Sequence, residues 1–173
     1  MKTYMVNSME DMKQFENESG YKVEGNLEVN CSLVFKKSLV VDGFLYIEAG
    51  EYIEAGGYIE AGGSIKAGEY INAGWSIEAG GYIKAGDNYG ISAGLHIICK
   101  DTLNFGLNAF AGICTWRETS DEDKTITCGK FEGGEVAYGV LKETGIESGK
   151  VKITCEGREV EISRESAKAL NFI

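Results

Sequence analysis

A six-residue unit repeats seven times in residues 46–86 and limits the possible folds more than any other feature: YIEAGEYIEAGGYIEAGGSIKAGEYINAGWSIEAGGYIKAG. Isoleucine recurs every six residues from Ile47 to Ile83, and an alanine follows each one by two residues, from Ala49 to Ala85. Because residues two apart in a strand share a face, each isoleucine and its alanine point inward. The following glycine supplies the backbone freedom that a corner needs. Each unit therefore predicts a short strand and a corner.

Strands this short cannot bury a face alone, so the units must coil until successive turns stack. Three six-residue sides make a coil of about 18 residues, whereas a four-sided coil would favour a five-residue period. A narrow triangular centre also explains why each side carries one large residue and one alanine. We therefore expect an all-β, three-sided parallel β-helix, and the six-residue period favours a left-handed coil.

The inward pattern extends beyond the obvious repeat. Counting back from Ile47 in steps of six residues reaches Val41, Phe35 and then Val29. In the other direction, the count resumes at Ile91 after a two-residue insertion at GDNYG. We therefore expect the β-helix to occupy residues 23–116.

The two ends of the chain predict additional structure. An open coil end would expose apolar core and unpaired strand edges, so residues 1–22 are expected to cap it. Their segment SMEDMKQF predicts a helix, N-capped by Ser8 and apolar on one side. After the polar RETSDEDK linker, alternating segments predict a small β-rich module within residues 117–173 that ends in a short helix.

Charge and cysteine usage narrow the function classes. Acidic residues outnumber basic ones by 27 to 17, and the formal net charge of −10 disfavours direct binding to nucleic acid or anionic membranes. A basic protein surface is the expected partner. The N-terminus carries no export signal pattern and no run of 18 apolar residues occurs, so a cytoplasmic protein is expected. Five single cysteines indicate no zinc or redox motif, and we expect no metal or cofactor.

Stacking of successive coils predicts rows of outward side chains. Residues 46–87 hold seven acidic residues and two lysines, and the coil period places Glu48 under Lys66 and Lys84. It also brings acidic residues and tyrosines together at one corner, while Trp75 should stack over Gly57 as an exposed corner residue. A solenoid needs a polar exterior, which alone could explain the acids. The alternative is a docking face for a basic partner, made of Glu51, Tyr52, Glu54, Glu69, Tyr70, Trp75 and Asp87.

The six-residue rhythm of residues 23–116 resembles that of left-handed β-helix acyltransferases, although isoleucine and alanine are exchanged relative to their usual pattern. That resemblance implies a trimeric enzyme with a histidine base at a subunit boundary. His96 is the single histidine of the chain, and alternation from Ile97 points it outward. Ice binding is disfavoured because the outward rows mix several residue types.

The segment SIKAGEYINAGWSIEAG resembles a group of phage and mobile-element proteins built on I-K-A-G-W and Y-I-E-A-G runs. The resemblance implies a non-enzymatic inhibitor of a host nucleic-acid-handling defence complex, of anti-CRISPR type, which imitates nucleic acid and acts in the bacterial cytoplasm. Two alternatives remain. One is the trimeric acyltransferase with His96 as base, and the other is a structural, self-assembling β-helix protein that forms homo-oligomers.

Overall fold

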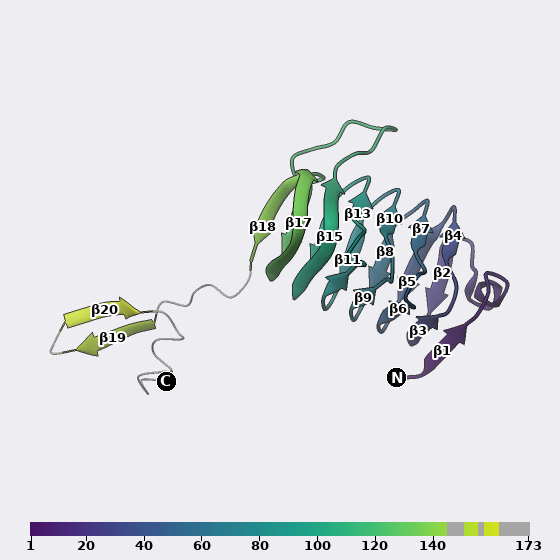
Figure 1. The fold of residues 1–173 in the computed structure, drawn as a ribbon, viewed down its shortest axis with the longest axis horizontal. Coiled ribbons are helices and arrows are strands. Elements are labelled where there is room, and N and C mark those ends of the chain that lie inside the picture. Colours follow the sequence, from purple (N-terminus) through teal and green to yellow (C-terminus); the bar gives the residue numbers. More distant parts are fainter. Residues whose placement is uncertain (145–150, 156–157, 163–173) are drawn as a thin grey trace.

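The computed structural model describes residues 1–144, 151–155 and 158–162. Short parallel strands stack one behind another along a coil, so the predicted all-β parallel β-helix is confirmed (Figure 1). The strands form three columns, which are the three sides of the coil.

The first side consists of β1 (Thr3–Val6), β3 (Asn26–Val29), β6 (Leu45–Ile47), β9 (Ile65–Lys66) and β12 (Ile83–Lys84). The second side consists of β4 (Leu33–Phe35), β7 (Ile53–Ala55), β10 (Ile71–Ala73) and β13 (Ile91–Ala93). The third side consists of β2 (Gly20–Val23), β5 (Ser38–Val41), β8 (Ile59–Ala61), β11 (Ile77–Ala79) and β14 (Ile97–Cys99). The long strand β15 (Thr102–Ala111) pairs with both β12 and β13 and so continues two sides.

Isoleucine ladders fill the centre of the coil. Ile53 pairs with Ile71, which pairs with Ile91, and the same stacking recurs on the other two sides. All three side chains are buried, as are the alanines from Ala55 to Ala85 that accompany the repeat. The inward alternation predicted from the sequence is confirmed over this stretch.

The predicted phase is wrong at the start of the repeat. Leu45 pairs with Ile65 and therefore occupies the position that the six-residue count assigned to Ile47. Ile47 pairs with Val29 and lies two residues further along the same strand. A turn at residues 48–50 inserts two residues, and Gly50 adopts a positive φ of 84° there. Ala49 is therefore exposed rather than buried.

Glycines at one corner allow successive coils to approach closely. A Cβ added to Gly74 would clash with the carbonyl oxygen of Gly56 in the coil below. This approach explains why the corner residue after each alanine from Ala55 to Ala85 is glycine.

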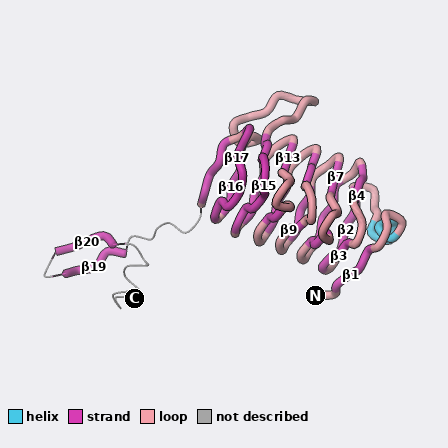
Figure 2. The backbone as a smooth tube through the Cα atoms, viewed as in Figure 1, coloured by secondary structure: helices cyan, strands magenta, loops and turns pink. Residues whose placement is uncertain are grey.

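The N-terminal end differs from the expected helical cap. Residues 3–6 form β1, which pairs with β3, so the coil begins well before residue 23. The helix is a short 3₁₀ helix, η1 (Asp11–Phe15), without a side-chain cap from Ser8 (Figure 2). The backbone N–H of Ser8 instead donates to the Asp11 carboxylate at 3.0 Å. The η1 helix still contributes an apolar side chain to the core, because Met12 is fully buried.

The coil also continues past its expected end at residue 116. Strands β16 (Thr125–Cys128) and β18 (Val140–Glu143) extend the third side, and β17 (Lys130–Tyr138) pairs along β15. A loop of residues 112–124 projects between β15 and β16 and interrupts the six-residue count (Figure 1). The first part of the expected C-terminal module is therefore the last part of the coil.

Strands β19 (Val151–Cys155) and β20 (Arg158–Ile162) form an antiparallel sheet of two strands. The expected final helix lies in residues 163–173, outside the described residues. In the part of the chain that the structure describes, no helix has the length and apolar character to cross a membrane.

Candidate binding face

Acidic and tyrosine side chains gather at the corner between the first and second sides. The backbone N–H of Glu69 donates to the carbonyl of Glu51 at 2.9 Å, so these two residues stack as predicted. The rings of Tyr52 and Tyr70 stack with centroids 4.5 Å apart and planes 19° apart. The Tyr89 ring lies 6.5 Å from the Tyr70 ring and extends the row. We call this cluster the acid–tyrosine edge; it comprises Glu51, Tyr52, Glu54, Glu69, Tyr70 and Tyr89.

Hydroxyl groups hold the three carboxylates of the acid–tyrosine edge. The Ser32 hydroxyl donates to Glu51. The Tyr70 hydroxyl donates to Glu54 at 3.3 Å, and the Tyr89 hydroxyl donates to Glu69 at 3.0 Å. Within residues 1–144, no lysine, arginine or histidine lies within ion-pairing distance of these carboxylates. The edge therefore presents fixed negative charges that its own chain does not neutralise there.

The hydroxyls of Tyr70 and Tyr89 remain proton donors near neutral pH. Burial raises the pKa of Tyr70 well above its usual range, and the Glu54 charge raises it further. The hydrogen bond to Glu69 raises the pKa of Tyr89. Both effects favour the protonated phenol, which is the form that can hold a carboxylate.

Two residues of the predicted face lie elsewhere. The backbone N–H of Gly86, rather than that of Asp87, donates to the carbonyl of Glu69, because a second two-residue insertion follows β12. Asp87 is exposed, and one of its carboxylate oxygens lies 4.0 Å from Lys84 Nζ. Trp75 stacks over Gly57 as expected, but at the opposite corner of the second side. Its ring is 46% exposed and stacks on Trp116, with centroids 5.3 Å apart.

The predicted charge pairing on the first side is also wrong. Lys66 pairs in register with Tyr46 below it and with Lys84 above it. Glu48 lies in the preceding turn, where it is exposed. The insertion at residues 48–50 moves Glu48 out of the row that the uninterrupted period assigned to it.

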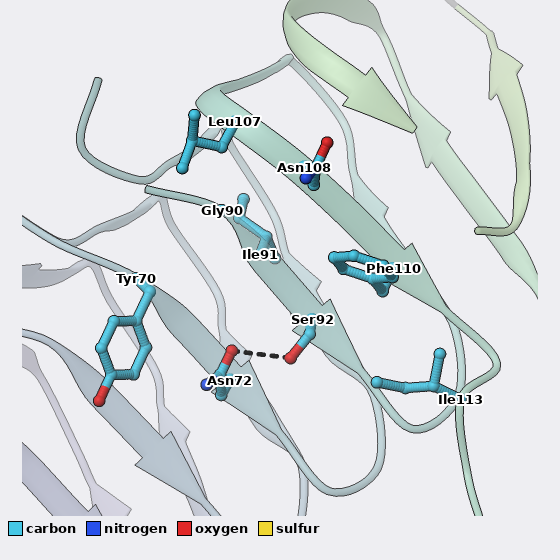
Figure 3. Close-up of a pocket in the computed structure, with 9 residues that line it drawn as sticks. All are labelled: Tyr70, Asn72, Gly90, Ile91, Ser92, Leu107, Asn108, Phe110 and Ile113. Carbon is cyan, nitrogen blue, oxygen red and sulfur yellow. Dashed lines mark hydrogen bonds between the residues drawn. The ribbon is translucent and has the colours of Figure 1, made fainter. Parts of the chain in front are cut away.

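A groove on the second side was not predicted. It has a volume of about 430 Å³ and lies over β10, β13 and β15 (Figure 3). The lining residues are Tyr70, Asn72, Gly90, Ile91, Ser92, Leu107, Asn108, Phe110 and Ile113. Asn72 and Ser92 form its floor, where the Ser92 hydroxyl donates to Asn72 Oδ1 at 2.7 Å (Figure 3). The two-residue insertion that the sequence shows at GDNYG puts these two small side chains in register 20 residues apart, although neither was singled out from the sequence.

His96 lies on the third side and points outward, as predicted. Its Nε2 lies 3.0 Å from a Glu78 carboxylate oxygen. The Ser76 hydroxyl donates to the same oxygen at 3.4 Å. The serine thus contacts the carboxylate rather than the imidazole, so the arrangement lacks the nucleophile-to-base hydrogen bond of a catalytic serine.

The chemistry of the remaining groups is limited. Burial raises the pKa of the Cys99 thiol to about 12 and that of the Cys128 thiol to about 11, which favours unreactive, packed thiols. In the described segments, no group of three or more histidine, cysteine or acidic residues is arranged to hold a metal ion.

The chain matches no known protein-family model, no curated protein and no solved structure. The candidate face is therefore assessed from its own geometry.

Proposed function

We propose that this protein is a non-enzymatic binding module whose acid–tyrosine edge docks on a basic protein surface. The observation that carries the proposal is the set of three carboxylates held by hydroxyls, without a cation from the described part of the chain. Carboxylates fixed in place lose little side-chain freedom on binding, and their charge steers a basic partner toward the face. The stacked tyrosines add aromatic contact area of the kind enriched in interfaces.

The partner class that fits best is a nucleic-acid-handling protein. Such proteins carry basic surfaces that neutralise a regular row of phosphates. Glu51 and Glu69 stack at the strand spacing of about 4.8 Å, and with Glu54 they form a compact cluster of negative charge. Together with the I-K-A-G-W resemblance, this supports an inhibitor of a host defence complex, of phage or mobile-element origin, that imitates nucleic acid in the bacterial cytoplasm.

Affinity capture from nuclease-treated bacterial lysate, washed at low and at high salt, tests this function. We expect a DNA- or RNA-processing protein to be enriched at low salt and depleted at high salt, because salt screens exposed charges. Recovery of no protein other than the bait, identified by mass spectrometry, would contradict the proposal.

A trimeric acyltransferase is the second candidate, because the Glu78 carboxylate can orient the His96 imidazole as a base. The enzyme would need a trimer that places His96 at a subunit boundary. A monomeric mass in solution by light scattering would remove this candidate, as would unchanged activity of a His96→Ala variant.

A self-assembling structural protein is the third candidate. At the C-terminal end of the coil, β17 pairs with β15 and β18 pairs with β16, and the inward residues of these last strands are only partly buried. An incompletely covered coil end can pair with another chain. A mass that does not change with concentration would exclude this role.

A further inference from the structure

We propose that the second-side groove binds an extended segment of the partner in which a basic residue is followed, four residues later, by an apolar residue. This inference rests on the proposed function, because the acid–tyrosine edge supplies the contact for the basic residue. It adds the conformation and the sequence spacing of the bound segment.

The far end of the groove is built to receive an apolar side chain. Phe110 lies on β15 between two other apolar lining residues: Ile113 follows it, whereas Leu107 lies further back along the strand, near Gly90 (Figure 3). Leu107 is 54% exposed and Ile113 is 44% exposed, which leaves apolar surface in contact with water. Exposed apolar residues gathered around one groove are typical of a binding site rather than of an ordinary surface.

The floor of the groove carries polar groups that suit a peptide backbone. The Asn72 carbonyl accepts the Ser92 hydroxyl, and no acceptor within residues 1–144 takes up the amide hydrogens of Asn72. Those hydrogens can donate to a backbone carbonyl, while the Ser92 oxygen can accept from a backbone N–H. A few polar groups between apolar walls fix the orientation of a bound chain.

The strand register sets the length of the bound segment. Glu54, Asn72, Ser92 and Phe110 are consecutive members of one outward row. Three strand spacings separate Glu54 from Phe110, which amounts to about 14 Å along the coil axis. Four residues of extended chain span about 13 Å, and the residues at either end then point to the same face.

Charge decides which end of these four positions receives the basic residue and which receives the apolar one. Glu54 lies at one end of the row, with its carboxylate held by Tyr70 and without a cationic partner in the described region. Phe110 lies at the other end. A lysine or arginine at the first position therefore meets the carboxylate when an aliphatic residue at the fifth position meets Phe110.

Two peptides of identical composition test the spacing. The probe is acetyl-Lys-Thr-Ser-Thr-Leu-amide, and its isomer acetyl-Lys-Thr-Leu-Thr-Ser-amide moves the leucine to the third position. Titration of the full chain at low salt, followed by NMR, should give about tenfold tighter binding of the probe, because partial burial of a leucine contributes on that order. The largest shifts should come from Asn72, Ser92 and Phe110.

Three variants locate the contact. Ser92→Trp fills the groove and should reduce binding of the probe to the level of its isomer. Glu54→Lys should weaken both peptides. Glu60→Lys changes the equivalent outward position of the third side, in register with Val40 and Glu78, and should leave binding unchanged.

Equal affinity for the two isomers, or unchanged probe binding by Ser92→Trp, would overturn the groove assignment. The proposed function would still stand in that case if Glu54→Lys weakened both peptides. Absence of binding by both peptides at low salt would also overturn the groove assignment, and the lysate capture would then decide the function independently.

Discussion

The first and second sides of the coil carry similar repeat units but present different surfaces. On the first side, the hydroxyls of Tyr46 and Tyr82 lie 3.0 Å apart and bond to each other, beside the stacked Lys66 and Lys84. On the second side, the tyrosine hydroxyls bond carboxylates instead. The first-side tyrosine hydroxyls bond to each other, whereas the second-side hydroxyls bond to the carboxylates that we propose as the docking site.

Truncation of the core should produce the largest effect and should not distinguish the sides. Ile71 lies under the second side and Ile65 under the first, and both are fully buried. Each change to alanine should lower the free energy of unfolding by about 2–5 kcal/mol. Denaturant titration of both variants checks this, and a much smaller loss for one of them would show that the sides differ in their core.

Alkaline titration should distinguish the sides more clearly. Burial raises the pKa of Tyr82 to about 12 and that of Tyr70 further. A phenol pKa that is higher in the folded state stabilises the fold fully below the unfolded value of about 10, and this stability is lost as the pH rises through the folded pKa. The Tyr70→Phe variant should therefore lose less stability above pH ~10 than the parent protein. Absorbance of the phenolate and denaturant titration at several pH values measure both quantities.

Removal of single hydroxyls should have a smaller effect. Tyr70→Phe deprives Glu54 of its donor and should cost about 1 kcal/mol of partner binding, because the carboxylate is no longer held. Tyr82→Phe on the first side should leave binding unchanged. Calorimetric titration with the captured partner compares the two variants, and equal losses would contradict the division between the sides.

The exposed contact between Lys84 and Asp87 should have the smallest effect. Their charged atoms lie 4.0 Å apart at the surface. Lys84→Ala should change the free energy of unfolding by less than about 0.5 kcal/mol. A thermal unfolding scan of the variant provides the measurement, and a loss above about 1 kcal/mol would indicate that the pair is structural.

The sequence predicts the regular part of the coil well, because an inward isoleucine–alanine pair in every six residues leaves a single way to stack. Between Ile53 and Ile83 the predicted strands, core and corners all occur. The phase changes at residues 48–50 and the loop at residues 112–124 were not predictable, since turns contribute little apolar periodicity. Each of these irregularities is local, but it determines which outward residues stack on one another in successive coils.

The candidate face likewise has a part that the sequence predicts and a part that it does not. Glu51, Glu69 and the Tyr52–Tyr70 stack lie within an uninterrupted coil, so a fixed period was enough to bring them together. Asp87 lies within the second insertion and falls out of the row. The groove also depends on larger side chains near the end of the coil, Leu107, Phe110 and Ile113, whose arrangement the repeat does not specify.

Affinity of the captured partner for two matched triple variants tests the central claim most directly. One variant changes Glu51, Glu54 and Glu69 to lysine. The other changes Glu24, Glu28 and Glu60 to lysine, which lie on the third side, on the first side and at the corner between them, away from the acid–tyrosine edge, so the net charge changes equally. If the edge is the binding site, the first variant abolishes binding and the second retains most of it. Equal loss in both variants, or full binding by the first, would contradict the account.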